Sequence, residues 1–288
     1  MRQIYVAFFV AVILLIMPIG SKALSGVDVS FSSETLARGD LILITIRADK
    51  EDNPRAIWMN KEIALIFDRT GASWKGFIAT DLNQRAGRYK VLVQAPSSGF
   101  EKSFDIRVTD KDYGVRNLTI PKEKVELDSD TLERVKSEAA VVKTLWDADS
   151  TSPEWNEAFL IPVDGSLVGA FGRKSIINNL ERSPHTGVDI RGKTGTPVKA
   201  TNNGRVILVA DHFFTGNALY VDHGGGIISM YFHLDKVLVR DGDNIKKGQV
   251  IGLIGATGRA TGPHLHWGVR INGARVNPLT LIELSKGL

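Results

Sequence analysis

Apolar and polar residues alternate along short segments of the chain, which is the pattern of β-strands with one buried face. Such alternation is clear at positions 103–108, and the run 41–46 consists almost entirely of residues that favour strands. Turn-forming residues, such as those at 97–99, separate these segments. Six or so short strands within residues 24–110 predict a β-sandwich of immunoglobulin type.

A second group of strand-like segments lies in the C-terminal part, at 205–209, 218–221, 226–231 and 250–254. Residues 160–288 also hold 20 of the 28 glycines and all six histidines of the chain. Glycines separate the segments at regular intervals, which indicates turns between strands. We therefore expect a second, antiparallel β unit here and a mostly β fold for the whole chain.

Residues 111–159 are predicted to connect the two units through one helix. Apolar residues recur there at three- and four-residue steps, and Ser129 can cap the start of the helix. The apolar positions are Leu132, Val135, Ala139, Val142 and Trp146. We expect this face to pack on one of the two β units.

The N-terminus has the features of an export signal. Arg2 precedes an apolar run from Ile4 to Ile19, and the small residues Ser21 and Ala23 follow it. The run is shorter than the roughly 20 residues that span a bilayer, so we expect cleavage after Ala23 rather than an uncleaved membrane anchor. With either outcome the remaining chain lies outside the cytoplasm, in a periplasm or at a cell surface.

Composition narrows the chemistry. The chain is 43% hydrophobic and 24% charged, which excludes a disordered protein, and it contains no cysteine, which excludes disulfides and thiolate metal sites. Basic residues exceed acidic ones in 160–288, whereas acidic residues exceed basic ones in 24–159. Because no basic run is interleaved with aromatic residues, nucleic acid is not an expected partner.

Two short clusters in the second unit carry side chains that bind zinc. His185 and Asp189 lie in one cluster, and His264 and His266 lie in the other. On a strand, His264 and His266 point to the same face, while Leu265 and Trp267 point to the core. On a straight strand His185 and Asp189 would be about 13 Å apart, so we expect a bend or bulge at Gly187 that brings them together.

A further histidine, His233, follows Tyr231 on a predicted strand. Strand alternation places Tyr231 and His233 on one face and Phe232 on the other. A neutral imidazole is suited to act as a proton acceptor beside a metal-activated water. Two alternatives stay open from residue chemistry alone: histidines with purely structural roles, and a closed structural site formed by His185, Asp189, His264 and His266.

Five segments in one order carry a family resemblance. They are H-T-G-V-D-I at 185–190, G-T-P-V-K-A at 195–200, Y-V-D-H-G-G-G at 220–226, Y-F-H-L at 231–234 and T-G-P-H-L-H-W at 261–267. Over about 160–285 the chain resembles the lysostaphin/LytM-type zinc endopeptidases of metallopeptidase family 23. The immunoglobulin-like unit ahead of the peptidase unit is similar to an arrangement in exported bacterial members.

The resemblance implies a role for each polar residue. His185, Asp189 and His266 correspond to the three ligands of a single Zn²⁺ ion. His264 and His233 correspond to the general base and the transition-state stabiliser, which makes them the predicted catalytic residues. The segment Phe171-Gly172-Arg173 resembles the start of the family domain.

Other residues near these motifs are expected to have mainly structural roles. We expect His223 to bond a turn, Trp267 to lie in the core, and Tyr231 either to pack in the core or to hydrogen-bond near the site. His212, ahead of Phe213-Phe214, is expected at the surface or at the border of a substrate groove.

The resulting hypothesis is an exported zinc endopeptidase that cuts peptide cross-links of peptidoglycan, with the stem peptides as its partner. A catalytically silent wall-binding protein or activator of wall amidases is the alternative, and the intact five-residue set argues against it. A zinc protease that acts on proteins is a further alternative. Three roles stay open for the acidic N-terminal unit: it could bind wall polymer, recruit a partner, or contact and cover the basic peptidase groove, and the last of these would make it autoinhibitory.

Overall fold

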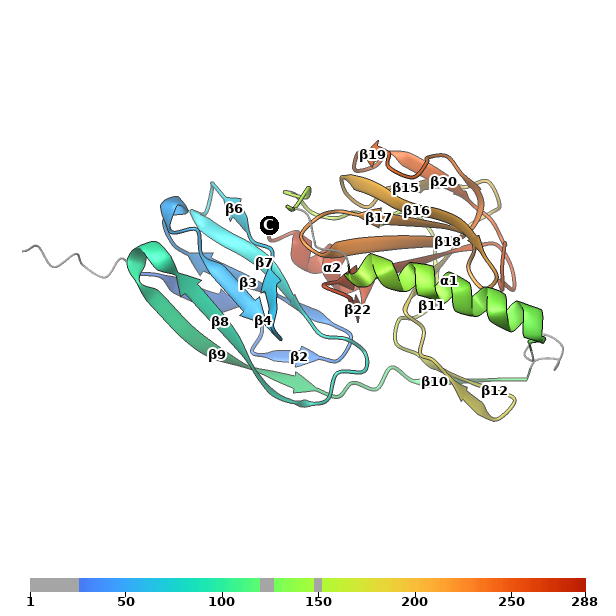
Figure 1. Ribbon diagram of the computed structural model, residues 1–288, viewed down its shortest axis with the longest axis horizontal. Coiled ribbons are helices and arrows are strands. Elements are labelled where there is room, and N and C mark those ends of the chain that lie inside the picture. The colour runs from blue at the N-terminus through green and yellow to red at the C-terminus, as the bar shows by residue number, and fades with distance from the viewer. Residues whose placement is uncertain (1–25, 120–126, 148–151) are drawn as a thin grey trace, which may run out of the picture.

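The computed structural model describes residues 26–119, 127–147 and 152–288, and the chain is mostly β, as predicted (Figure 1). The expected export signal therefore lies outside the described residues. Within these residues, no helix is long and apolar enough to cross a membrane.

The N-terminal unit is a sandwich of two sheets, built from nine strands among the described residues. One sheet has the order β1 (Asp28–Phe31), β3 (Leu41–Arg47), β7 (Ser73–Ala79), β6 (Ile66–Asp68). The other has the order β2 (Thr35–Ala37), β9 (Phe100–Thr109), β8 (Gly87–Ala95), β4 (Arg55–Trp58), β5 (Lys61–Ile63). Two short 3₁₀ turns, Lys50–Asp52 and Pro96–Ser98, lie in the loops between strands.

Both faces of strand β3 are largely buried, which explains why its sequence lacks polar alternation. Ile42, Ile44 and Ile46 point into the core between the two sheets. Leu41, together with Phe77 of β7, belongs instead to a second apolar core that this sheet shares with the C-terminal unit. A strand with both faces buried needs apolar residues at successive positions.

The C-terminal unit is built on a large, mainly antiparallel sheet. Its main path is β11 (Leu167–Gly169), β14 (Gly187–Arg191), β21 (His264–Ile271), β18 (Ile227–Val237), β17 (Gly216–Asp222), β16 (Gly204–His212), β19 (Asn244–Ile245). Three more strands pair off this path: β15 (Pro197–Lys199), β20 (Val250–Ile254) and β22 (Ala274–Val276). Helix α2 (Pro278–Ser285) follows β22 and is capped by Asn277, whose side chain accepts a hydrogen bond from the backbone N–H of Leu279.

The two units share one continuous apolar core rather than touching at a loose hinge. Phe77 of the sandwich packs against Trp155, with ring centroids 5.5 Å apart, and Leu281 of α2 is fully buried in the same core. At the edge of this contact, the guanidinium of Arg275 donates two hydrogen bonds to the carboxylate of Asp81. Burial opposes ionisation of Asp81, but these bonds hold the pKa of its carboxyl below the usual value.

The connecting segment contains more structure than the sequence indicates. Strand β10 (Val115–Leu118) pairs in parallel with β12 (Lys174–Ile177), which pairs with β13 (Leu180–Arg182) to form a small separate sheet. The sequence analysis missed β10 because a four-residue strand has almost no periodicity to detect.

Helix α1 (Ser129–Asp147) packs on the large sheet of the C-terminal unit, in line with the expectation that it packs on one β unit, but its cap and its buried face differ in detail. The cap is Asp128, whose carboxylate accepts a hydrogen bond from the backbone N–H of Thr131, and not Ser129. Leu132 is 42% exposed. Near the end of the helix, Val142, Leu145 and Trp146 contact an apolar patch around Tyr220 and Phe232.

His223 is buried and structural, as expected from its sequence context. Its Nδ1 bonds the carbonyl oxygen of Asn203 at 2.6 Å, and its Nε2 bonds the hydroxyl of Ser229 at 2.7 Å. Burial lowers the pKa of His223 to about 4, whereas an unfolded histidine titrates near 6.5.

This difference predicts acid sensitivity of the fold. Between pH 6.5 and 4 the unfolded chain takes up a proton at His223 that the folded chain does not, so stability falls as pH falls through this range. From pH 7 to pH 5 the expected loss from His223 is about 2 kcal/mol. We expect denaturant unfolding to show a flatter pH dependence for His223→Gln than for the wild type. Equal slopes would contradict this assignment.

Candidate active site

The two strands β14 and β21 bring Asp189 and His266 together. They pair antiparallel, and Asp189 is directly opposite His266 in the register. His264 lies two residues before His266 on the same strand, while Leu265 and Trp267 are fully buried in the core. The alternation predicted for 264–267 is therefore observed.

His185 reaches the same place from outside the strand. Strand β14 begins at Gly187 and pairs with β21 from that residue without a register shift, so the bulge predicted at Gly187 is wrong. His185 lies in the irregular segment just before the strand, where its backbone N–H donates to the carbonyl of Arg173. A Cβ at Gly187 would overlap the carbonyl oxygen of Trp267 and lie 2.7 Å from Nε2 of His266. Glycine is thus needed for close approach rather than for a bend.

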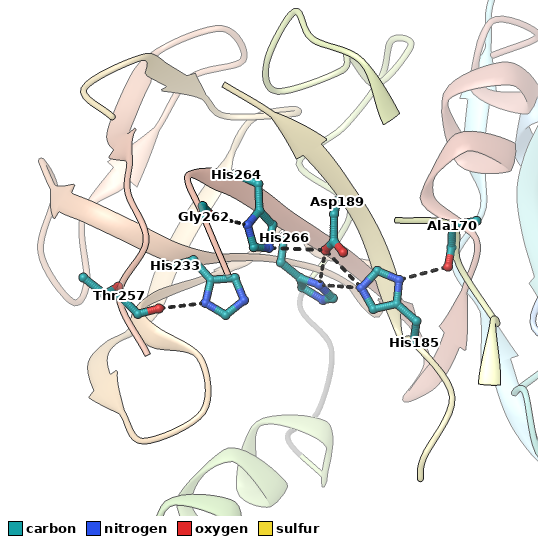
Figure 2. A network of polar contacts seen from close by, with 8 residues as sticks. All are labelled: Ala170, His185, Asp189, His233, Thr257, Gly262, His264 and His266. Atoms are coloured by element: carbon teal, nitrogen blue, oxygen red, sulfur yellow. Dashed lines mark hydrogen bonds and ion pairs between the residues drawn. The ribbon is translucent and has the colours of Figure 1, made fainter. Parts of the chain in front are cut away.

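Three potential ligand atoms form a compact triangle (Figure 2). Nε2 of His185 lies 3.0 Å from Oδ1 of Asp189 and 2.9 Å from Nδ1 of His266. The third side, from Nδ1 of His266 to Oδ1 of Asp189, is 3.0 Å. Ligands about 2.0–2.2 Å from a tetrahedral Zn²⁺ are about 3.3 Å apart, so this set of two imidazoles and one carboxylate fits zinc.

The ring of His185 is oriented by a backbone carbonyl. Its Nδ1 lies 2.9 Å from the carbonyl oxygen of Ala170. This bond assigns the proton to Nδ1. The lone pair of Nε2 is therefore free to bind a metal ion together with the other two ligand atoms.

His264 and His233 lie side by side next to the triangle, with ring centroids 4.8 Å apart. Each is oriented through Nδ1, which lies 2.7 Å from the carbonyl of Gly262 for His264 and 2.9 Å from the carbonyl of Thr257 for His233. Carbonyl oxygens only accept, so both rings carry their proton on Nδ1 and present the lone pair of Nε2. Nε2 of His264 is 3.8 Å from Oδ1 of Asp189.

The predicted face of His233 is wrong. His233 has a positive φ of 63°, and the pairing of β17 with β18 shifts its register near this point. Regular alternation is lost, so Tyr231 points into the core, where its hydroxyl bonds the backbone N–H of Thr201. Phe232 and His233 both contact His266 instead. The Phe232 ring stacks on the His266 ring at 5.3 Å.

Charge and burial divide the site into an ionised carboxylate and neutral imidazoles. Burial opposes ionisation of Asp189, yet its hydrogen bonds to His185 and His266 hold the pKa of its carboxyl well below the usual value. Burial lowers the pKa of His266, and it lowers that of His233 to about 4. His233 is therefore neutral at physiological pH and can accept a proton.

Other elements support the site without any sequence signal that identifies them. The carbonyl groups of Ala170, Gly262 and Thr257 orient three histidines, but every residue type has a carbonyl. Phe232 links His266 to the patch under α1. His212 is buried at the end of β16, with its ring against Tyr220 and not within the histidine cluster.

Comparison with known proteins finds a family match over the part of the chain that carries this site. The family model for peptidase family M23 matches residues 183–278, which include His185, Asp189, His233, His264 and His266. The chain is 45% identical over 96 residues to the peptidoglycan DD-endopeptidase ShyB of Vibrio cholerae, a match that covers 33% of this chain and 22% of that protein. It is 42% identical over 97 residues to the DD-carboxypeptidase/endopeptidase Mpg of Neisseria meningitidis, covering 34% of this chain and 22% of that protein.

The chain thus matches less than a quarter of the length of these curated relatives. A crystal structure described as an M23 peptidase from Pseudomonas aeruginosa extends the similarity to both units. It is 32% identical, with a TM-score of 0.67, and the match covers 86% of this chain and 95% of that one. On these grounds the chain belongs to peptidase family M23.

Proposed function

We propose that the protein is an exported zinc endopeptidase that hydrolyses peptide cross-links of bacterial peptidoglycan. The observation that carries the proposal is the triangle of His185, Asp189 and His266 with the pair His264 and His233 beside it. Curated relatives that are named peptidoglycan DD-endopeptidases, such as ShyB of Vibrio cholerae, support the substrate class.

His185, Asp189 and His266 would hold one Zn²⁺ ion. The ion would lower the pKa of a water molecule and polarise the amide carbonyl. The carboxylate of Asp189 supplies one negative charge, and the imidazoles supply neutral donors.

His264 and His233, the two histidines beside the triangle, would handle the proton transfer. Nε2 of His264 has a free lone pair close to the triangle, so it can accept the proton of the attacking water as a general base. His233 presents the lone pair of its own Nε2 beside that ring, and we propose that it stabilises the transition state by accepting a hydrogen bond from the attacking water as positive charge develops on that water. Hydrolysis adds hydroxyl to the carbonyl carbon and returns the proton to the leaving amine, which separates the two peptide strands.

The decisive experiment is mass spectrometry of muropeptides after peptidoglycan is incubated with the purified protein. We expect cross-linked dimers to disappear, a zinc chelator to prevent this, and added zinc to restore it. The masses of the products identify the bond that is cut.

Intact dimers after incubation with zinc-loaded protein would contradict the proposal and favour a non-catalytic activator. A casein assay run in parallel tests the alternative of a protease that acts on proteins. Cleavage of casein but not of dimers would assign the chain to that class.

A further inference from the structure

A groove of about 690 Å³ opens directly beside the proposed catalytic residues. Asp189 and His264 line one end of it, and the segment 261–263 forms part of its wall. Three cationic side chains also line the groove: Arg116, Arg191 and Lys193. The groove therefore joins the site where peptide hydrolysis is proposed to a strongly basic surface.

These cations are not neutralised within the described part of the chain. The ion pairs and side-chain hydrogen bonds found there include none from the side chains of Arg116, Arg191 or Lys193. The single acidic residue in the groove is Asp189, whose carboxylate is already engaged by His185 and His266. Unpaired cations around a concave surface favour an anionic ligand.

Arg116 comes from the connecting segment and not from the part that matches the family model, 183–278. Strand β10 holds it in place by pairing with β12, where Arg116 is opposite Ser175 (Figure 1). Just before β10, the Tyr113 ring packs edge-on against Phe171 at 5.6 Å, and its hydroxyl donates to the carbonyl of Arg38. The groove wall is thus anchored at the contact between the two units.

The basic surface continues beyond Arg116. Ser175 is in turn opposite Arg182 on β13, so Arg116 and Arg182 flank Ser175 on one face of the small sheet. Arg259 stacks on the Phe214 ring at 4.2 Å. The pKa of Arg259 is lowered mainly by burial and, to a smaller extent, by repulsion from the positive charge of Arg182.

We propose that this groove binds a free carboxylate of the substrate close to the bond that is cut, and that Arg116 is a specificity-determining residue supplied by the connecting segment. The inference rests on the proposed function and deepens it. It selects cross-links whose residues carry a free carboxylate over neutral ones such as oligoglycine. A guanidinium recognises a carboxylate through two parallel hydrogen bonds, which a carboxamide cannot reproduce.

The test uses two cross-linked peptides that differ only in one group next to the scissile amide, a carboxylate in one and its carboxamide in the other. We expect the wild type to prefer the acid about tenfold in kcat/KM, mainly through KM, because several exposed charge contacts act together. Arg116→Glu is expected to reduce this ratio to about one or below. The preference should also shrink at high salt, which screens exposed charges.

Arg88→Glu is the matched control, since Arg88 is an exposed arginine on β8 of the sandwich and carries the same charge change. It should keep the wild-type ratio. Calorimetric binding of both peptides to wild type and Arg116→Glu gives a readout that does not depend on turnover.

The outcomes separate this inference from the proposed function. Cleavage of acid and amide at equal rates by the wild type would overturn the carboxylate subsite and leave the endopeptidase intact. An unchanged ratio in Arg116→Glu would overturn the role of Arg116. If neither peptide is cut, the proposed function fails, and equal binding of the two peptides would then overturn the subsite as well.

Discussion

Replacing His264 with alanine is expected to lower kcat/KM on a cross-linked muropeptide by about a thousandfold while the protein keeps its zinc. The loss is the usual size for removal of a general base. Zinc should stay because the triangle of ligand atoms is formed by His185, Asp189 and His266 alone. The measurement is steady-state cleavage together with metal content after dialysis.

His212→Ala provides the matched control for this variant. It removes a histidine from the same sheet, but one whose ring faces Tyr220, so most of the activity should remain. Full activity in His264→Ala would reject the assignment of the general base.

Replacing His266 with alanine is expected to release the zinc and to reduce cleavage to the level of chelated wild type. Nδ1 of His266 lies within 3.0 Å of both other ligand atoms, and two protein ligands hold zinc far more weakly than three. The substitution also removes the ring on which Phe232 stacks, so the neighbouring patch loses packing. Metal analysis and the zinc-dependent shift of the unfolding temperature measure the effect.

The pair of variants decides between an open and a closed metal site. Nε2 of His264 is 3.8 Å from Oδ1 of Asp189, so a closed site would recruit His264 as the fourth ligand. In that case His264→Ala would lose zinc affinity along with His266→Ala. Zinc loss confined to His266→Ala supports the open site that a hydrolase requires.

Local periodicity explains which parts of the site could be predicted. His264 and His266 share a face because strand alternation depends only on neighbouring residues. The pairing of Asp189 with His266 joins residues 77 positions apart, and periodicity carries no information about it. The zinc-binding chemistry of the side chains grouped these residues, and only the family motifs selected His266 rather than His264 as the third ligand.

The errors around His233 and His185 have a common cause. The sequence analysis assumed regular strands, but His233 has a positive φ, which is uncommon for any residue other than glycine and leaves no mark in the hydrophobic pattern. This torsion and the register shift of β18 against β17 place His233 beside His266 rather than on the core face of Tyr231. At His185 the strand simply starts later than assumed.

The connecting segment was the least predictable part of the fold. The 3.6-residue period of α1 was visible, but the face that it buries includes Glu138, whose carboxylate accepts from the backbone N–H of Phe213. Because Glu138 is charged, the spacing of apolar residues alone could not predict that this face of the helix is buried. Strand β10 forms by pairing with β12, some 60 positions later in the chain, and this pairing places Arg116 in the groove.

We expect the apolar core that joins the two units to make them one cooperative folding unit as well. Leu41 and Phe77 of the sandwich pack in the same cluster as Val188 and Leu265, which adjoin the metal-binding residues in sequence. Opening either unit would expose this shared surface, so the two should unfold together. A ligand that binds only the folded metal centre then stabilises both units. Amide hydrogens of β3, which has no part in the metal site, would exchange more slowly when zinc is bound.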